Sequence, residues 1–419
     1  MQNLKDSGVQ WIGAVPKHWR TNRLGTLYRL RNTKVSDRDY PPLSVTNKGI
    51  VPQLETAAKT DAHDDRKLVC AGDFAINSRS DRRGSCGISP CDGSISLINT
   101  VLSPLSNMNP DYYNWLFHTV GFADEFYRWG HGIVDDLWTT GWQEMKNISI
   151  PVPPLDEQEK IARFLDEKCA EIDALMARIS DEIDLFKEKK VSIIMQTVWK
   201  GLNSDSSLKH SGVPWIGTIP SCWDLVPVKY LCEEVSEKND IGKITNALKF
   251  TYGSIVQKTN FDAENDEYVA DTILTYTIIR PGDIVINCLN LNYDFVSQRV
   301  GINSQVGVIT SAYLAIRVKD LARLNPFYAN YALKAYDGAK AFHNMGKGVR
   351  KTLGFDELGR QLLPLPSLKE QEQIVNYLNR QCELIDGAIE IKDKQLKTLD
   401  SYKKSIIYEY VTGKKEVAQ

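Results

Sequence analysis

Apolar side chains recur with a period of seven along two long segments of the chain. In the first segment they form two neighbouring rows, and charged side chains fill most of the remaining positions. The rows are Leu165, Ile172, Ile179, Phe186 and Ile193, and Ile161, Cys169, Met176, Ile183 and Thr197. A heptad pattern of this length predicts a coiled-coil helix. Prolines at 153 and 154 precede it, and we expect Asp156 to cap its first turn, with Glu159 three residues further on.

A second helix of the same kind is predicted from Leu368 to about Val411. Its register is broken once, by Lys392. The residues that keep the register are Leu378, Ile385, Leu399 and Ile406. A helix with one apolar stripe cannot bury that stripe alone, so we expect the two helices to pack on each other. About 45 residues at 1.5 Å each give a rod of at most roughly 68 Å, which is about two turns of DNA. A coiled coil that only joins two copies of the chain is the alternative.

The remaining segments mix short strands with shorter helices. Gly72-Asp73 and Gly282-Asp283 each predict a turn that is followed by a buried strand. Helices are expected after Asn109-Pro110 and Asn325-Pro326, because Asn is a good cap and Pro suits the first helical position. These patterns predict an α+β fold, of mixed α/β character.

Two blocks of the sequence occur twice. Residues 7–19 and 211–223 are identical at eight of thirteen positions, in the form Ser-Gly-Val-x-Trp-Ile-Gly-x-x-Pro-x-x-Trp. Residues 153–161 and 366–374 share Pro-x-Leu-x-Glu-Gln-Glu-x-Ile. Between the blocks the two halves match only in scattered places. The order is that of a duplicated domain with a duplicated connector, which predicts an internal pseudo-two-fold symmetry.

Composition and charge narrow the class of protein. The 419 residues are 42% apolar and 25% charged, which are ordinary values for a globular protein. No run of about 18 apolar residues occurs, and the first residues lack the apolar core of a signal peptide, so we expect a cytoplasmic protein. The eight cysteines form no C-x-x-C pair, which favours reduced thiols over a zinc site. A net charge of −2 argues mildly against nucleic acid, unless basic residues gather locally.

Three local clusters are candidates for contacting DNA. The first two follow the predicted Gly-Asp strands, and the third is a basic loop that contains glycine. Arginine can read guanine, asparagine and glutamine can read adenine, and a glycine-rich backbone can approach a phosphate closely. The candidate DNA-binding residues are Arg79, Arg82 and Arg83 in the first cluster, Asn292, Tyr293 and Arg299 in the second, and Lys347, Arg350 and Lys351 in the third. A solvated surface loop is the alternative for each cluster.

Signals for catalysis are weak. Asn325-Pro326-Phe327-Tyr328 resembles the N-P-P-[FY] loop of amino-methyltransferases but lacks the second proline, and Asn109-Pro110-Asp111-Tyr112 in the corresponding place indicates a shared helix start. Pro110-Asp111 with Glu144-Met145-Lys146 is a nuclease-like pattern that the second half does not repeat. No G-x-x-x-x-G-K-[ST] loop for ATP is present. We therefore expect a chain without catalytic or metal-binding residues. A coiled-coil scaffold that holds proteins together without reading DNA is the alternative function.

In combination, these motifs resemble the specificity (S) subunits of type I restriction-modification enzymes. The resemblance rests on Trp-Ile-Gly-x-x-Pro-x-x-Trp at 11–19 and 215–223, on the two Gly-Asp strands, and on the Pro-x-Leu-x-Glu-Gln-Glu blocks, and it covers nearly the whole chain. It implies two target-recognition domains that each read one half of a split DNA site, and two antiparallel helices that set the gap between the halves. The implied limits are 1–152 and 204–365 for the domains, and 153–203 and 366–419 for the spacer helices.

The resemblance also implies partners. They are double-stranded DNA, two modification (methyltransferase) subunits that methylate adenine, and restriction subunits that carry a nuclease and an ATP-driven motor. S-adenosylmethionine, ATP and Mg²⁺ would then belong to those subunits, and none of them to this chain. If such partners enclose the DNA, this chain needs only local base-reading loops, so its net charge of −2 is compatible with DNA binding. Asp135-Asp136 stand in the first half where the basic loop of the second half would be, so the two halves do not correspond loop by loop.

Overall fold

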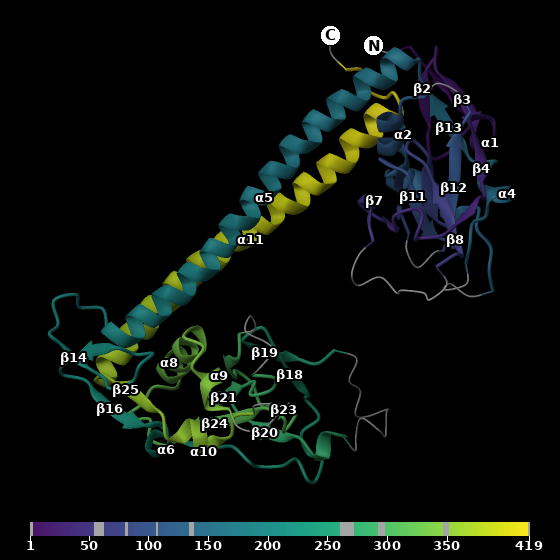
Figure 1. The fold of residues 1–419 in the computed structure, drawn as a ribbon. Helices are drawn as coiled ribbons and strands as arrows, with labels where there is room; N and C mark the ends of the chain where they lie inside the picture. Colours follow the sequence, from purple (N-terminus) through teal and green to yellow (C-terminus); the bar gives the residue numbers. More distant parts are fainter. Residues whose placement is uncertain are drawn as a thin grey trace. The chain divides into compact units, whose positions relative to one another are not determined.

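The chain divides into two compact units that share the long helices. The computed structural model describes residues 3–53, 63–79, 83–105, 108–133, 138–259, 272–291, 298–346 and 352–417. The first unit is Met1–Ser180 with Asp393–Gln419, and the second unit is Asp181–Lys392. Helices α5 (Leu155–Lys200) and α11 (Leu368–Val411) each pass from one unit into the other (Figure 1). Both long helices are thus confirmed. The finer division into recognition domains and spacers, with limits at 152, 203 and 365, stays a prediction.

The first unit is organised around a four-stranded antiparallel sheet in the order β10-β9-β12-β4. Its strands are β10 (Cys86–Ile88), β9 (Phe74–Asn77), β12 (Asn99–Pro104) and β4 (Tyr28–Arg31). The other strands are β1 (Leu4–Asp6) with β2 (Ala14–Pro16), β6 (Leu43–Thr46) with β7 (Gly49–Pro52), β3 (Arg20–Arg23) with β13 (Ser149–Val152), and β11 (Gly93–Ser96), β8 (Arg66–Val69) and β5 (Lys34–Val35) in one small sheet. The helices are α1 (Leu24–Leu27), α2 (Pro110–Phe117), α3 (Val120–Arg128) and α4 (Trp142–Met145).

The second unit repeats this arrangement, with the sheet order β22-β21-β24-β17. Its strands are β22 (Val300–Ile302), β21 (Ile284–Ile286), β24 (Leu314–Val318) and β17 (Cys232–Glu234). The other strand pairs are β14 (Leu208–His210) with β15 (Thr218–Pro220), β18 (Leu248–Thr251) with β19 (Ser254–Gln257), β20 (Thr277–Ile279) with β23 (Gly307–Ile309), and β16 (Asp224–Pro227) with β25 (Leu362–Leu365). The helices are α6 (Val228–Leu231), α8 (Pro326–Gly338), α9 (Phe342–Met345) and α10 (Phe355–Gly359). The duplication predicted from the repeated blocks is therefore present in the fold as well.

The two Gly-Asp turns precede buried strands, as predicted. Gly72 and Gly282 have φ angles of 86° and 92°, in the left-handed region that glycine enters without strain. Asp73 is buried and accepts a hydrogen bond from the amide of Cys70 at 2.8 Å, which closes the turn before β9. Its counterpart Asp283 is buried too and accepts from the amide of Arg280 at 2.7 Å, before β21.

Each buried aspartate is also paired with an arginine from another strand of the same sheet. Arg31 of β4 donates to Asp73 through Nε at 2.5 Å and Nη2 at 3.1 Å, and Arg317 of β24 donates to Asp283 through the same two atoms at 2.7 Å each. A buried carboxylate requires such a partner, because an unpaired charge in the interior is costly. The turn is thereby fixed to the sheet in both units, although the arginine comes from a different strand in each.

The two predicted Asn-Pro helix starts are confirmed. Asn109 precedes α2, and its side chain accepts a hydrogen bond from the amide of Tyr112 at 2.8 Å. Asn325 precedes α8 and accepts from the amides of Phe327 and Tyr328. In both cases proline is the first helical residue, where its missing N–H is not needed.

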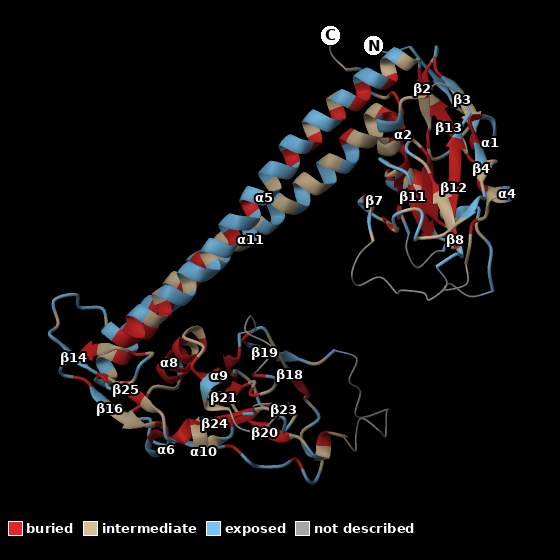
Figure 2. Ribbon diagram, viewed as in Figure 1, coloured by how far each residue is buried: buried red, intermediate tan, exposed pale blue. Residues whose placement is uncertain are grey.

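The apolar stripes of the long helices are largely buried, as the heptad pattern predicted. In α5, Leu165, Ile172, Ile179 and Ile183 are buried, and Figure 2 shows the alternation of buried and exposed positions along both helices.

In the first unit Phe164 of α5 packs on Tyr410 of α11, with ring centroids 4.4 Å apart. The beginning of α5 thus pairs with the end of α11. In the second unit the end of α5 pairs with the beginning of α11, so the helices are antiparallel.

One detail of the first long helix was predicted wrongly. α5 begins at Leu155, so Asp156 lies inside the first turn instead of capping it. The backbone carbonyl of Pro154 accepts the amides of Glu157 and Gln158, and Asp156 lies 3.7 Å from Lys160 one turn later. Proline has no donor to lose, which allows the helix to begin directly after Pro154. None of the described helices is both long and apolar enough to cross a membrane.

Candidate nucleic-acid interface

The repeated blocks fold against each other and build the same frame in both units. The indole of Trp19, in the first Trp-Ile-Gly block, donates to Glu157 Oε2 of α5 at 2.8 Å. The indole of Trp223 donates to Glu370 Oε2 of α11 at 3.0 Å. Both tryptophans are buried, and a buried indole N–H needs an acceptor. The second tryptophan of one block and the first glutamate of the other are therefore identical in both halves because they bind each other.

The glutamine that follows each glutamate joins the helix to the globular part of its unit. Gln158 Oε1 accepts the amide of Asn109 at 3.0 Å, and its Nε2 donates to the carbonyl of Pro153 at 2.8 Å. Gln371 Oε1 accepts the amide of Asn325 at 2.8 Å, and its Nε2 donates to the carbonyls of Arg323 and Pro366 at 2.9 Å each. The repeated Glu-Gln pair is visible in the sequence, but only the structure shows that the glutamine connects each long helix to the residue that caps α2 or α8.

Two ion pairs between the long helices obey the internal symmetry. Lys403 is 2.6 Å from Asp173 in the first unit, and Lys190 is 2.7 Å from Asp386 in the second. Lys403 follows Lys190, and Asp386 follows Asp173, by the same 213 positions that separate the second pair of repeated blocks. Lys392, which breaks the heptad register, pairs with Glu182 at 2.6 Å. The helix pair thus carries the reciprocal contacts expected of a two-fold interface.

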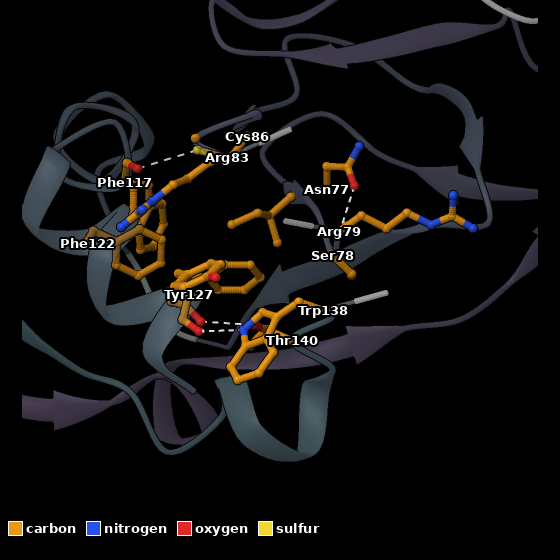
Figure 3. Close-up of a pocket in the computed structure, with 14 residues that line it drawn as sticks. Asn77, Ser78, Arg79, Arg83, Cys86, Phe117, Phe122, Tyr127, Trp138 and Thr140 are labelled. Carbon is orange, nitrogen blue, oxygen red and sulfur yellow. Dashed lines mark hydrogen bonds between the residues drawn. The ribbon is translucent and has the colours of Figure 1, made fainter. Parts of the chain in front are cut away.

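In the first unit the strand β9 ends at a small pocket whose lining includes Arg79 and Arg83 of the first arginine cluster. The pocket is lined by the strand end, by α3 and by the segment around Trp138 (Figure 3). Tyr127 and Trp138 stack with centroids 5.6 Å apart, and the Trp138 indole donates to the Tyr127 carbonyl at 2.9 Å. These contacts place an aromatic surface beside the strand end.

The two described arginines of this cluster have different surroundings. The guanidinium of Arg83 lies 4.8 Å from the centre of the Tyr127 ring and forms an ion pair with Asp124. Arg79 is exposed, and its side chain extends away from the pocket (Figure 3). The Arg79 backbone is fixed: its amide donates to Asn77 Oδ1 at 3.0 Å, and it bridges to Thr139. With the described residues, the Arg79 guanidinium forms no hydrogen bond or ion pair, so it is the arginine that is available to a ligand.

In the second unit Arg299 corrects the sequence-based expectation. Its side chain is fully buried, and Nη1 donates to the carbonyls of Asn287 and Leu289 at 3.0 and 2.8 Å. Its amide donates to Asp337 Oδ2 at 2.8 Å. Arg299 therefore holds the segment that follows β21 and does not present its guanidinium to a base. A buried guanidinium needs acceptors, and the two backbone carbonyls supply them here.

The other predicted contact residues lie outside the described residues. They are Arg82, Asn292, Tyr293, Lys347, Arg350 and Lys351, together with the acidic pair at 135 and 136. Their assignment as DNA contacts stays a prediction.

The titratable groups near the strand ends do not form a reactive cluster in the described part of the chain. Burial raises the pKa of the Cys86 thiol to about 12 and that of the Cys288 thiol to about 12. Both are therefore protonated near neutral pH, and a protonated thiol is a poor nucleophile. The described residues contain no group of three or more His, Cys, Asp or Glu side chains placed to hold a metal ion.

Comparison with known proteins agrees with this architecture. Residues 140–185 match the family model "Type I restriction modification DNA specificity domain". The chain is 26% identical over 285 residues to a putative type I restriction enzyme MjaX specificity subunit, and 26% identical over 284 residues to a type I restriction enzyme MjaVIII specificity subunit, both from Methanocaldococcus jannaschii. The matches cover 65% and 64% of this chain, and 60% and 62% of those relatives, which is less than two thirds of their length.

A solved structure shares the fold over almost the whole chain. It comes from work on the complex assembly and conformational transition of the type I R-M system, and it aligns with a TM-score of 0.63 at 17% identity, over 95% of this chain and 98% of that chain. The fold and the repeated frame define a two-unit protein with paired connecting helices. In sequence the chain is similar to specificity subunits of type I restriction enzymes, and its residues 140–185 match the model of their DNA specificity domain.

Proposed function

We propose that this chain is the DNA-reading subunit of a type I restriction-modification complex and that it has no catalytic activity itself. Each unit reads one half of a bipartite DNA site, and the α5–α11 pair sets the gap between the two halves. The observation that carries the proposal is the duplicated frame: Trp19–Glu157 and Trp223–Glu370 hold two related sheets to one antiparallel helix pair. A protein built this way presents two different strand-end surfaces on equivalent supports, which suits a target made of two different halves.

The chemistry would be supplied by partners in the cytoplasm. Two modification subunits would methylate adenine, and restriction subunits would cleave DNA, so S-adenosylmethionine, ATP and Mg²⁺ would bind those subunits. The two-fold relation between Lys190–Asp386 and Lys403–Asp173 supports a stoichiometry of two modification subunits, because equivalent surfaces on the two halves offer equivalent docking sites.

The alternative of a scaffold that does not read DNA remains as the second hypothesis. The helix pair would serve a scaffold equally well, whereas an exposed arginine at the end of β9, as at Arg79, favours DNA reading. The interpretation of Asn325-Pro326 as a methyltransferase loop is weakened, because the Asn325 side chain accepts hydrogen bonds from the first amides of α8 and caps that helix.

The test is to map methylated adenine in genomic DNA from cells that express the chain with its modification subunit, against cells that lack the chain. We expect a split motif with a fixed gap that occurs only when the chain is present. A partner that is bound and active but produces no chain-dependent motif would support the scaffold hypothesis.

A further inference from the structure

The hairpin β18–β19 of the second unit ends in an exposed tyrosine whose backbone is strained. Thr251 pairs with Ser254, so Tyr252 and Gly253 form a two-residue turn. Their φ angles are 47° and 76°. Two positive φ angles define the type I′ turn, in which Asn-Gly is favoured and a bulky first residue costs free energy. The Tyr252 side chain is 80% exposed, so no packing in the described structure offsets this cost.

The turn is nevertheless held firmly against the sheet. Gly253 is buried, and a Cβ added to it would lie 2.8 Å from Gln298 Oε1 and 3.4 Å from the Val300 carbonyl. A Cβ added to Gly301 of β22 would lie 2.7 Å from the Gly253 carbonyl. The hairpin therefore rests on β22 through two glycines in close contact. Tyr252 projects from a rigid support, next to the exposed Gln298.

The base of the hairpin explains why the tip cannot relax. Phe250 and Ile255 pack on the small core that contains Leu248 and Val285, and the rings of Phe250 and Tyr313 have centroids 5.8 Å apart. Because both strands are anchored, the pairing register of β18 with β19 is fixed, and this register places Tyr252 in the turn. Strained residues that the surrounding structure holds in place are concentrated at binding sites.

The first unit has an equivalent hairpin with different chemistry at its tip. In β6–β7, Thr46 pairs with Gly49, and the turn residues Asn47 and Lys48 are both exposed. This hairpin too contacts a glycine of the neighbouring strand: a Cβ on Gly87 of β10 would lie 2.8 Å from Gly49 Cα. In both units, therefore, the hairpin rests on a glycine of the neighbouring strand while the turn residues differ, as expected of an element that reads a different half-site in each.

We propose that Tyr252, with Gln298 beside it, contacts base pairs of the half-site read by the second unit and is a specificity-determining residue. The inference rests on the proposed function. An exposed aromatic ring can pack on a thymine methyl group or an unstacked base, and glutamine can hydrogen-bond adenine in the major groove. A rigid turn gives such contacts a defined position at little further cost in conformational entropy.

The decisive variant is Tyr252→Asn, because it separates a recognition role from a structural one. Asparagine is favoured at this turn position, so we expect the unfolding temperature of the variant complex to be equal to or higher than that of the wild type. We expect its methylation of the wild-type motif to fall at least about tenfold, with relaxed preference at one or two positions of a single half-site. The other half-site and the gap should be unchanged.

The experiment maps methylated adenine for the wild type, Tyr252→Asn, Tyr252→Phe and Tyr230→Asn, each expressed with the modification subunit. Tyr252→Phe keeps the ring and should keep the motif, which makes it the second variant if Asn impairs expression. Tyr230 is a matched control, a 63% exposed tyrosine on α6 of the same unit. A wild-type motif that Tyr252→Asn methylates unchanged at every position overturns this inference and leaves the proposed function intact. A wild type without any chain-dependent motif overturns the proposed function itself.

Discussion

Removing the side chain of Gln371 should destabilise the second unit, because that side chain joins α11 to the globular part. Gln371 is fully buried and makes three hydrogen bonds to backbone groups of Asn325, Arg323 and Pro366. A typical internal hydrogen bond contributes about 1 kcal/mol net, so Gln371→Ala should cost roughly 3 kcal/mol. For a unit of this size that corresponds to a fall of about 6–12 °C in its unfolding temperature.

The equivalent residue of the first unit provides an internal comparison. Gln158 makes two such bonds, to Asn109 and Pro153, so Gln158→Ala should cost roughly 2 kcal/mol and act on the first unit. Gln373→Ala, two residues after Gln371 but exposed, controls for the change in helix propensity. Scanning calorimetry gives the unfolding temperatures, and hydrogen exchange shows which unit loses protection. The reasoning fails if Gln371→Ala is no more destabilising than Gln373→Ala, or if protection is lost equally in both units.

Further predictions address recognition, spacing and pH. Arg79→Ala should weaken reading of one half-site by roughly tenfold while leaving the unfolding temperature unchanged, which methylation mapping and calorimetry together can check. Arg350→Ala or Lys351→Ala should weaken binding to the other half-site; unchanged affinity at moderate salt for both would contradict that. Deleting one heptad from each long helix should change the gap in the methylated motif, and an unchanged gap would refute the role of the helices as a ruler. Burial raises the pKa of Asp337, although the Arg299 amide opposes the shift. A raised folded-state pKa contributes stability that is present below the ordinary value and is lost as pH rises through the raised one. The unfolding temperature of Asp337→Asn relative to the wild type should therefore increase between pH 4 and pH 7, and a constant difference would count against the shift.

The sequence predicted the features whose signal is local or periodic. The heptads placed α5 and α11, and the Asn-Pro and Gly-Asp pairs located two helix starts and two turns, because each follows from backbone chemistry within a few residues. Asp156 was misplaced as a cap because the helix begins two residues earlier than that cap implies, at Leu155, directly after the prolines.

The candidate contact residues were harder to assign, because exposure depends on the tertiary fold. Arg79 and Arg299 both follow a Gly-Asp strand in a polar segment, yet one is exposed and the other is fully buried. The Arg299 guanidinium is held inside by the carbonyls of Asn287 and Leu289, and the Asp337 carboxylate of α8 accepts the Arg299 backbone amide from 38 positions away. Tyr252 carried no signal as a DNA contact either, since only the pairing of Thr251 with Ser254 places it at a strained turn.

Comparison of the two units shows that the strand ends share their backbone geometry, whereas the residues that follow them differ. Asn77 and Asn287 occupy equivalent strand ends, and their amides donate to the carbonyls of Ser85 and Arg299 at 2.9 and 2.8 Å. The backbone geometry is therefore shared, while a serine stands in one unit where a buried arginine stands in the other. Two positions further along, Arg79 is exposed and its counterpart Leu289 is half-buried. Under the proposed function, we therefore expect a change of target in one half to come from substitutions beyond these strand ends and at the hairpin tips, because such substitutions leave the Trp–Glu and Gln–backbone contacts to the helices unchanged.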